Sequence, residues 1–173
     1  MIDKRNVVDF YKYWTDDAIR ADLDEKRHNF SVLVTNFIRD FNLSTVIRCS
    51  NAFLAKNVII YGSKQYDRRG TIGTHHYTNF KHVKEIESLD GILEDSVMIG
   101  INNLENSIPI EDYKWDYNKH IIMAFGEESV GLRPEVIERC SEILYIKQYG
   151  TVRSLNVGCA SAIAMFSYMQ KKG

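Results

Sequence analysis

The 173-residue sequence contains only two prolines and ten glycines. So little of either argues against long linkers, collagen-like repeats and low-complexity disorder. No apolar run reaches the roughly 18 residues that a membrane-spanning helix needs, and the charged segment after Met1 is unlike a signal peptide. We therefore expect one globular domain with a substantial core and no membrane contact.

Cysteine is also scarce: the chain has Cys49, Cys140 and Cys159, and no Cys-x-x-Cys pair. An odd number of widely spaced cysteines argues against a disulfide framework and a structural zinc site, and favours the reducing cytoplasm. Because each lies in an apolar helical context, we expect all three to pack in the core. We expect no metal site.

Neither sign of charge predominates, because 22 Lys and Arg face 23 Asp and Glu, for a formal net charge of -1. This balance excludes attraction of the whole molecule to nucleic acid, so any such contact must be a local patch. Segment 64–84 is such a patch, with stacking side chains for unpaired bases among its cations. Its cations are Lys64, Arg68, Arg69, Lys81 and Lys84, and its rings are Tyr66, His75, His76, Tyr77 and Phe80. The alternative interpretation is a solvated loop.

Short apolar segments alternate with helical patterns along most of the chain. The expected strands cover 31–34, 57–61, 96–101, 120–125 and 143–146, and the expected helices cover 44–53, 83–94, 110–115, 134–140 and 154–170. This alternation predicts an α/β fold with a mainly parallel sheet and helices on both faces. Ligands bind such folds at the carboxyl ends of the strands.

The first thirty residues have a different pattern. Thr15, followed by two acids, predicts the start of a helix. An apolar stripe at helical spacing comprises Val7, Tyr11, Trp14, Ala18 and Ala21. We expect an N-terminal helical extension over 1–30, ahead of a domain over 31–173. Its charged side is either a solvated face or a substrate-binding arm.

The common nucleotide-binding signatures are missing. The chain has no Gly-x-Gly-x-x-Gly after a strand and no Walker sequence ending in Lys-Ser/Thr. Gly126 and Gly131 enclose two acids, which would repel phosphates. Dinucleotide and ATP enzymes are therefore disfavoured, and an ordinary Rossmann-like nucleotide enzyme remains a minor alternative.

One loop-to-helix junction, 42–48, combines polar residues with an apolar helix. Asn42 or Ser44 can cap the helix. Arg48, buried in this otherwise apolar helix, needs an anionic partner. A turn residue and a structural ion pair are the ordinary explanations of Asn42 and Arg48.

Two more junctions lie late in the chain. In 125–132, the glycines let the backbone approach a flat ligand closely. In 150–157, Ser154 is the expected N-cap of the last helix, and Asn156 directs its amide from the first turn. Each again has an ordinary explanation, as a solvated loop acid or a simple cap.

Together the three junctions resemble the three motifs of the SPOUT superfamily, in its SpoU/TrmH branch of RNA ribose methyltransferases. That branch has an Asn followed six residues later by Arg, then Gly-x-Glu-x-x-Gly-Leu/Ile, then Ser-x-Asn-Val. The resemblance covers 32–170, and the set of motifs is highly specific. The matching residues are Asn42, Arg48, Gly126, Glu128, Gly131, Leu132, Ser154, Asn156 and Val157.

The resemblance implies a deep trefoil knot in the C-terminal part and a homodimer whose RNA touches both subunits. We interpret the small residues over 158–164 as core and dimer contact. The implied cofactor is S-adenosylmethionine, bent among three loops. Its expected contacts are Asn102, Gly126, Gly131, Ile146 and Leu155, with Asn103 beside them.

The expected reaction is methyl transfer to a ribose 2'-hydroxyl of RNA. A guanidinium stays protonated in proteins. Our hypothesis is therefore that Arg48 clamps the phosphate beside the ribose, while phosphate or water takes the proton. The expected catalytic residues are Asn42, Arg48, Glu128, Ser154 and Asn156, and the expected RNA-binding residues are Lys64, Arg68, Arg69 and Arg153. Asn42 and Asn156 would orient the hydroxyl and Arg48, with Glu128 and Ser154 holding the loops.

The chain departs from the family in two places. It has Ile146-Lys147-Gln148 where Ile-Pro-Met is common, and Arg153 where many relatives have Glu. Arg153 and the Asp67–Gly70 stretch look like the minimal wobble-ribose tRNA methyltransferases. tRNA is therefore the favoured substrate. Ribosomal RNA, and a catalytically silent knotted RNA-binding module, are the alternatives.

Overall fold

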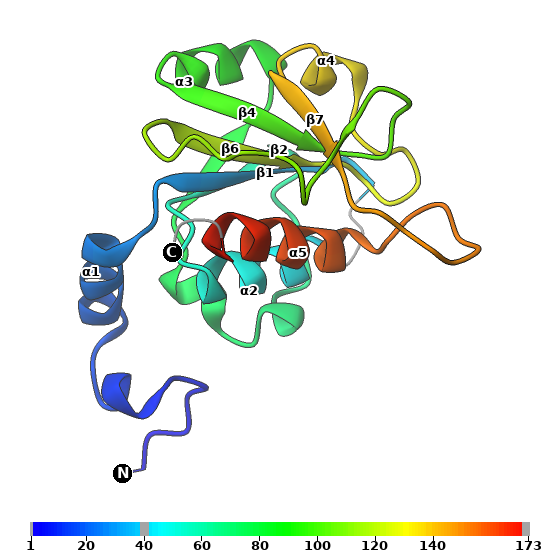
Figure 1. The fold of residues 1–173 in the computed structure, drawn as a ribbon. Helices are drawn as coiled ribbons and strands as arrows, with labels where there is room; N and C mark the ends of the chain where they lie inside the picture. The colour runs from blue at the N-terminus through cyan, green and yellow to red at the C-terminus, as the bar shows by residue number, and fades with distance from the viewer. Residues whose placement is uncertain (1, 39–41, 171–173) are drawn as a thin grey trace.

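The computed structural model describes residues 2–38 and 42–170, and its centre is one parallel sheet (Figure 1). The strand order is β3-β2-β1-β6-β4-β7-β5, and every neighbouring pair is parallel. The strands are β1 Phe30–Asn36, β2 Val58–Gly62, β3 Phe80–Val83, β4 Ser96–Ile101, β5 Ile108–Pro109, β6 His120–Phe125 and β7 Glu142–Tyr145. The expected α/β fold with a parallel sheet is confirmed.

Helices cover both faces of this sheet. Figure 1 shows α2 and α5 below it and α3 and α4 above it. The α-helices are α1 Asp16–Lys26, α2 Asn42–Ala52, α3 Asp90–Leu93, α4 Pro134–Ile137 and α5 Val157–Gln170. The 3-10 helices are η1 Asp9–Tyr11, η2 Arg68–Thr71, η3 Thr74–Tyr77 and η4 Ile86–Leu89.

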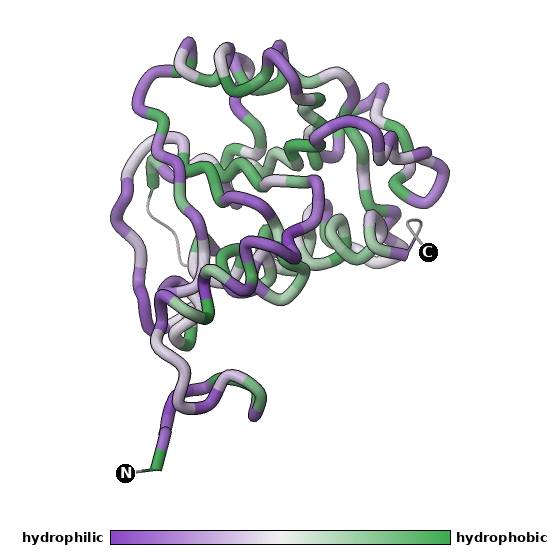
Figure 2. Tube along the Cα trace, turned by 90° about the vertical axis from the view of Figure 1, so that its left-hand side faces the viewer, coloured by the Kyte–Doolittle hydropathy of each residue, from purple (hydrophilic) through white to green (hydrophobic). Residues whose placement is uncertain are grey.

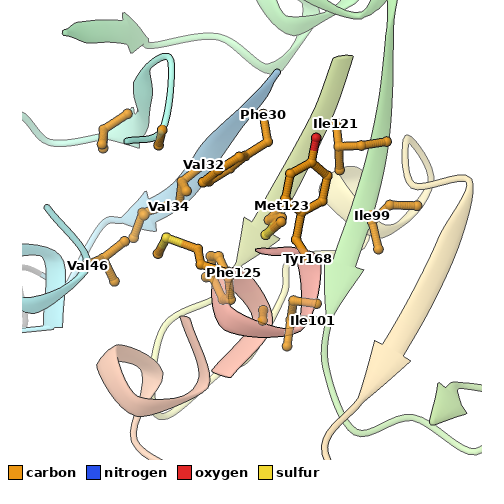
Figure 3. Close-up of a cluster of buried hydrophobic side chains, with 14 of the residues drawn as sticks. Phe30, Val32, Val34, Val46, Ile99, Ile101, Ile121, Met123, Phe125 and Tyr168 are labelled. Carbon is orange, nitrogen blue, oxygen red and sulfur yellow. The ribbon is translucent and has the colours of Figure 1, made fainter. Parts of the chain in front are cut away.

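Successive side chains along the strands pack alternately into two separate hydrophobic cores, one on each face of the sheet. In β1, Phe30, Val32 and Val34 face α2 and α5, while Leu33 faces the opposite helices. Figure 3 shows Tyr168, from α5, between strand residues of the first core. Its ring centroid lies 5.0 Å from that of Phe30. These apolar strands are buried on both sides, as parallel sheets require.

Several expected elements differ from the structure. The expected helix over 83–94 is replaced by the end of β3, then η4 and the short α3. The expected helix over 110–115 is wrong: the segment is turn and coil, and Ile110 and Trp115 are buried core residues. Core contacts explain their apolar pattern better than helical periodicity does. The strands β3 and β5, four and two residues long, were not expected.

The N-terminal segment projects from the rest of the chain in both Figure 1 and Figure 2. Thr15 caps α1 as expected, since its hydroxyl oxygen accepts from the N–H of Ala18 at 3.2 Å. The expected apolar stripe is wrong at Trp14, Ala18 and Ala21, which are exposed. The helix begins at Asp16, so a different face turns inward, and its buried residues are Ile19 and Leu23.

The cysteines are more exposed than expected. Cys49 and Cys140 are half-buried, and burial raises the pKa of the Cys140 thiol to about 12. Cys159 is exposed because its position on α5 points away from the core. The expectation that all three pack in the core is therefore wrong for Cys159.

The described residues contain no helix long and apolar enough to cross a membrane.

Candidate active site

The loops after β4, β6 and β7 surround a cavity of about 600 Å³, open solvent included. Because the strands are parallel, their carboxyl ends meet at one edge of the sheet, where ligands of such folds bind. Side chains of Ile101, Phe125 and Val157 supply apolar walls. The five residues expected to contact a cofactor all line this cavity: Asn102, Gly126, Gly131, Ile146 and Leu155.

The 126–131 loop requires glycine at both ends. Its backbone folds back on itself, with the Glu127 N–H donating to the Gly131 carbonyl at 3.1 Å and the Gly131 N–H donating to the Glu127 carbonyl at 2.7 Å. A Cβ at Gly126 would lie 1.9 Å from the carbonyl carbon of Gly131. Gly131 itself has φ of +73°, in the left-handed region that glycine tolerates. The result is a bare backbone wall in the cavity.

Three side chains, one from each junction, form a continuous hydrogen-bonded chain. Asn42 donates its amide to the Glu128 carboxylate at 2.9 Å. Asn156 donates its own amide to the Asn42 amide oxygen at 2.6 Å. Glu128 and Asn156, which lie 86 and 114 positions after Asn42 in the sequence, are thus brought together with it. A polar cluster therefore borders the cavity that Glu128 lines.

The cap of α5 differs from expectation, and one of the two candidates for the cap of α2 is wrong. Asn156, not Ser154, caps α5: its amide oxygen accepts from the N–H groups of Gly158 at 2.9 Å and Cys159 at 3.3 Å. Ser154 lies in the exposed loop before the helix and lines the cavity. Ser44 does not cap α2, because its hydroxyl donates instead to the Asp67 carbonyl.

Arg48 is exposed on α2, so the expected burial of its guanidinium is wrong. Position 48 lies on the side of the helix away from the sheet, whereas Val46 and Ile47 are buried. No hydrogen bond or ion pair joins Arg48 to any residue in 2–38 or 42–170. Within this part of the chain the structural ion pair is therefore not found.

The expected RNA-binding residues lie in two places, in and just before η2 and in the loop before α5. Lys64, Arg68 and Arg69 are exposed beside α2, where a Cβ on Gly70 would lie 2.7 Å from the Cβ of Ser44. Arg69 pairs with Asp67 at 2.7 Å, whereas Arg153 is exposed on the loop before α5.

One of the rings expected to stack on bases is not available. Tyr77 is buried against Ile19 and Leu23 of α1, so the expectation that it stacks on bases is wrong. His75 is held by a 2.6 Å hydrogen bond between its Nδ1 and the Thr71 hydroxyl. Phe80, with 39% of its surface exposed, remains open to a partner.

Two residues of the site were missed in the sequence. Glu127 is 3% exposed, and nothing in the sequence distinguishes it from its neighbour Glu128. Gln148 lines the cavity, and its buried Oε1 has no hydrogen-bond partner among the described residues. Its Nε2 donates to the carbonyl oxygen of Arg153 at 3.4 Å. Because a carbonyl can only accept, the nitrogen of the amide must face Arg153 and the oxygen must face away from it. The sequence signal that could have identified Gln148 is that it stands where the family commonly has the Met of Ile-Pro-Met.

These features fit the cofactor that the resemblance implies. The glycine backbone offers a surface for a flat adenine, and the apolar walls suit its rings. The orphaned oxygen of Gln148 offers an acceptor for an N–H donor, which both the adenine amine and the ammonium group supply.

A parallel α/β sheet with a glycine-walled cavity at its carboxyl edge defines a domain that binds a small, partly flat ligand. The family described as SpoU rRNA Methylase matches residues 29–166, and the chain belongs to that family.

Similar proteins share much of the chain at low identity. The chain is 23% identical to the tRNA (guanosine(18)-2'-O)-methyltransferase of Aquifex aeolicus over 89% of its own length and 75% of the relative's. It is 31% identical to the 23S rRNA (guanosine-2'-O-)-methyltransferase RlmB of Acinetobacter baylyi over 39% of its length, and spans only 27% of that relative. The AdoMet-bound rRNA methyltransferase of Sinorhizobium meliloti superposes with a TM-score of 0.73 at 23% identity, covering 86% of this chain and 59% of that one. This structural likeness confirms the fold.

Proposed function

We propose that this protein transfers a methyl group from S-adenosylmethionine to a ribose 2'-hydroxyl of RNA. The observation that carries the proposal is the Glu128–Asn42–Asn156 chain of hydrogen bonds at the edge of the cavity. It joins all three motif segments at one place, as a shared active site requires. Family membership supports the same chemistry.

When bound, S-adenosylmethionine supplies an electrophilic methyl group, so the protein must position a ribose hydroxyl in line with it. Arg48 is exposed and holds an RNA phosphate beside the target ribose through charge-assisted hydrogen bonds. Asn42 and Asn156 orient the hydroxyl, while Glu128 fixes Asn42 and Ser154 borders the methyl donor. The phosphate or a water takes the proton, because a guanidinium cannot.

tRNA is the proposed substrate. The Asp67–Gly70 stretch and Arg153 support it, as does the match to the Aquifex tRNA enzyme over most of both chains. Lys64, Arg68 and Arg69 would contact its backbone next to α2, and Arg153 would do so from the other side of the cavity. Ribosomal RNA is the alternative substrate, which the RlmB relatives support.

The test supplies labelled S-adenosylmethionine with unmodified tRNA and ribosomal RNA in separate reactions. We expect a 2'-O-methylated nucleoside in digested tRNA, identified by mass spectrometry. Methylation of a base instead, or no transfer to either RNA, would contradict the proposal. RNA binding without any calorimetric affinity for the cofactor would identify a silent RNA-binding module.

The Gln148→Met variant should raise stability and weaken cofactor binding at once. Methionine removes the buried, unpartnered Oε1, which should stabilise the free protein by about 1 kcal/mol. The same change removes an acceptor for the cofactor, so its Kd should rise roughly fivefold. Thermal unfolding and calorimetry with S-adenosylhomocysteine measure the two effects. Unchanged affinity would mean that Gln148 does not contact the cofactor.

We also propose a homodimer that forms through α5. Ile163 and Phe166 are 38% and 52% exposed, and their spacing of three places them on one face of the helix. A partner subunit would cover this apolar pair.

Phe166→Glu should therefore shift the protein from dimer to monomer, because it places a charge in an apolar contact. Light scattering after gel filtration gives the mass. Phe80→Glu, at a 39% exposed phenylalanine on the far edge strand, is the control and should leave the dimer intact. A monomeric unmodified protein would contradict the proposal.

We make three further proposals, the first of which follows from the resemblance. The C-terminal part forms a trefoil knot, and the chain divides into an extension over 1–30 and a domain over 31–173. The family match from residue 29 and the start of β1 at Phe30 support this division. A cytoplasmic location is supported by the three unpaired cysteines.

A further inference from the structure

Glu127 makes contacts that its neighbour Glu128 does not. Its Oε1 accepts hydrogen bonds from the backbone N–H groups of Phe37 and Ile38, both at 2.6 Å. Its Oε2 accepts from the Arg133 guanidinium at 3.0 Å. The side chain is 1% exposed, so these donors replace water around a buried carboxylate.

The side chains of Arg133 and Phe37 pack against each other beside the Glu127 carboxylate. The Arg133 guanidinium lies 4.1 Å from the centroid of the Phe37 ring. Phe37 in turn meets the Tyr61 ring edge-on, with centroids 4.9 Å apart. The Glu127 carboxylate, the Arg133 guanidinium and the Phe37 ring thus form one unit, which we call the Glu127 latch.

The two successive glutamates hold the two ends of one connection. Glu127 binds residues 37 and 38, where the chain leaves β1, and Glu128 binds Asn42, where α2 begins. Both carboxylates belong to the 126–131 loop, whose backbone forms the glycine wall of the cavity. The loop that lines the cavity is therefore attached both to the end of β1 and to the start of α2.

We infer that Glu127 is a positioning residue that couples the 126–131 loop to residues 37 and 38, while Glu128 couples the same loop to Asn42. Binding of the cofactor against the loop then fixes Asn42, and through it Asn156, in place for the ribose. Glu127 also lines the cavity, but in this role its buried carboxylate acts through the loop and Asn42 rather than by contact with a reactant. The inference deepens the proposed function and rests on it for the catalytic part of its test.

The test compares Glu127→Gln and Arg133→Gln with the unmodified protein. Glutamine keeps an oxygen that accepts from the backbone N–H groups, but its N–H₂ group faces the Arg133 guanidinium, which is also a donor. The contact between residues 127 and 133 is therefore lost. At saturating cofactor and RNA, kcat should fall about tenfold in each variant, with KM for the cofactor changed by less than about threefold. A role in stability alone would lower Tm and leave kcat of the folded protein unchanged.

The double variant shows whether the two residues act together. If they form one latch, its loss of kcat should about equal that of either single variant, because coupled residues are not additive. Losses that multiply, or an unchanged kcat, would overturn the inference. Arg139→Gln is the matched control: it breaks the ion pair of 2.7 Å with Asp90, farther along the same segment, and should change nothing.

Amide hydrogen exchange gives a readout that needs no RNA. Adding S-adenosylhomocysteine should slow exchange at residues 37 and 38 in the unmodified protein and have no such effect in Glu127→Gln. If Glu127→Gln does not fold, Arg133→Gln carries the same test, since Arg133 is 31% exposed. Cofactor binding without slower exchange would overturn the latch and leave the proposed function standing. If the unmodified protein binds the cofactor and shows the slower exchange but methylates no RNA, the latch stands and the proposed function is wrong.

Discussion

Replacing Arg48 with alanine should lower methyl transfer about 100-fold, because a misplaced ribose loses the in-line geometry. Arg48 is exposed and has no partner within the described residues, so its removal leaves no buried acid unpaired. Stability and cofactor affinity should therefore stay unchanged. Initial rates with tRNA, thermal unfolding and calorimetry measure the three quantities.

The Arg48→Lys variant separates a phosphate clamp from a proton acceptor. Lysine keeps the charge but loses the bidentate geometry, so the clamp predicts a partial loss at every pH. A titrating base predicts that the lysine variant regains high activity at alkaline pH. A pH profile of kcat that rises steeply to full activity would show that the clamp is wrong.

Gly126→Ala should abolish measurable cofactor binding. The new Cβ would lie 1.9 Å from the carbonyl carbon of Gly131, so the backbone must move and the cavity wall is lost. We expect Kd to rise at least about 100-fold, which corresponds to about 2.8 kcal/mol. Calorimetry with S-adenosylhomocysteine measures it.

Gly150→Ala is the control for this variant. Gly150 lies in the loop between the cavity-lining residues Gln148 and Ser154, but a Cβ there would meet no atom within 4 Å. Its cofactor affinity should match that of the unmodified protein. Normal affinity in Gly126→Ala would mean that the 126–131 loop does not form the cofactor wall.

Periodicity predicted the long elements well and the short ones poorly. The strands β1, β2, β4, β6 and β7 came within two residues of their bounds because buried parallel strands are continuous apolar runs. β3 and β5 are too short to show a pattern. The segment 110–115 is apolar at helical spacing, yet Trp115 is held by an edge-on contact with Tyr168 rather than by a helix.

Motif order predicted that residues of all three junctions would meet, but not how, and Arg48 is not among those that do. Asn42, Glu128 and Asn156 are joined by hydrogen bonds that sequence spacing cannot reveal. The capping role of Asn156 was assigned to Ser154 because either residue type suits an N-cap. Glu127 was missed because burial of one of two adjacent acids depends on where the 126–131 loop packs.

The strand order also governs when the protein can fold during synthesis. The strand β1 pairs with β6, the central strand of the sheet, whose residues emerge from the ribosome about ninety positions later. Until then, β1, β2 and β3 form at most a half-sheet with one unpaired edge of apolar strand, a template for association with other chains. Slow, late closure of such long-range pairs is expected for parallel sheets. Nascent chains that stop before residue 120 should therefore need a chaperone to remain dispersed.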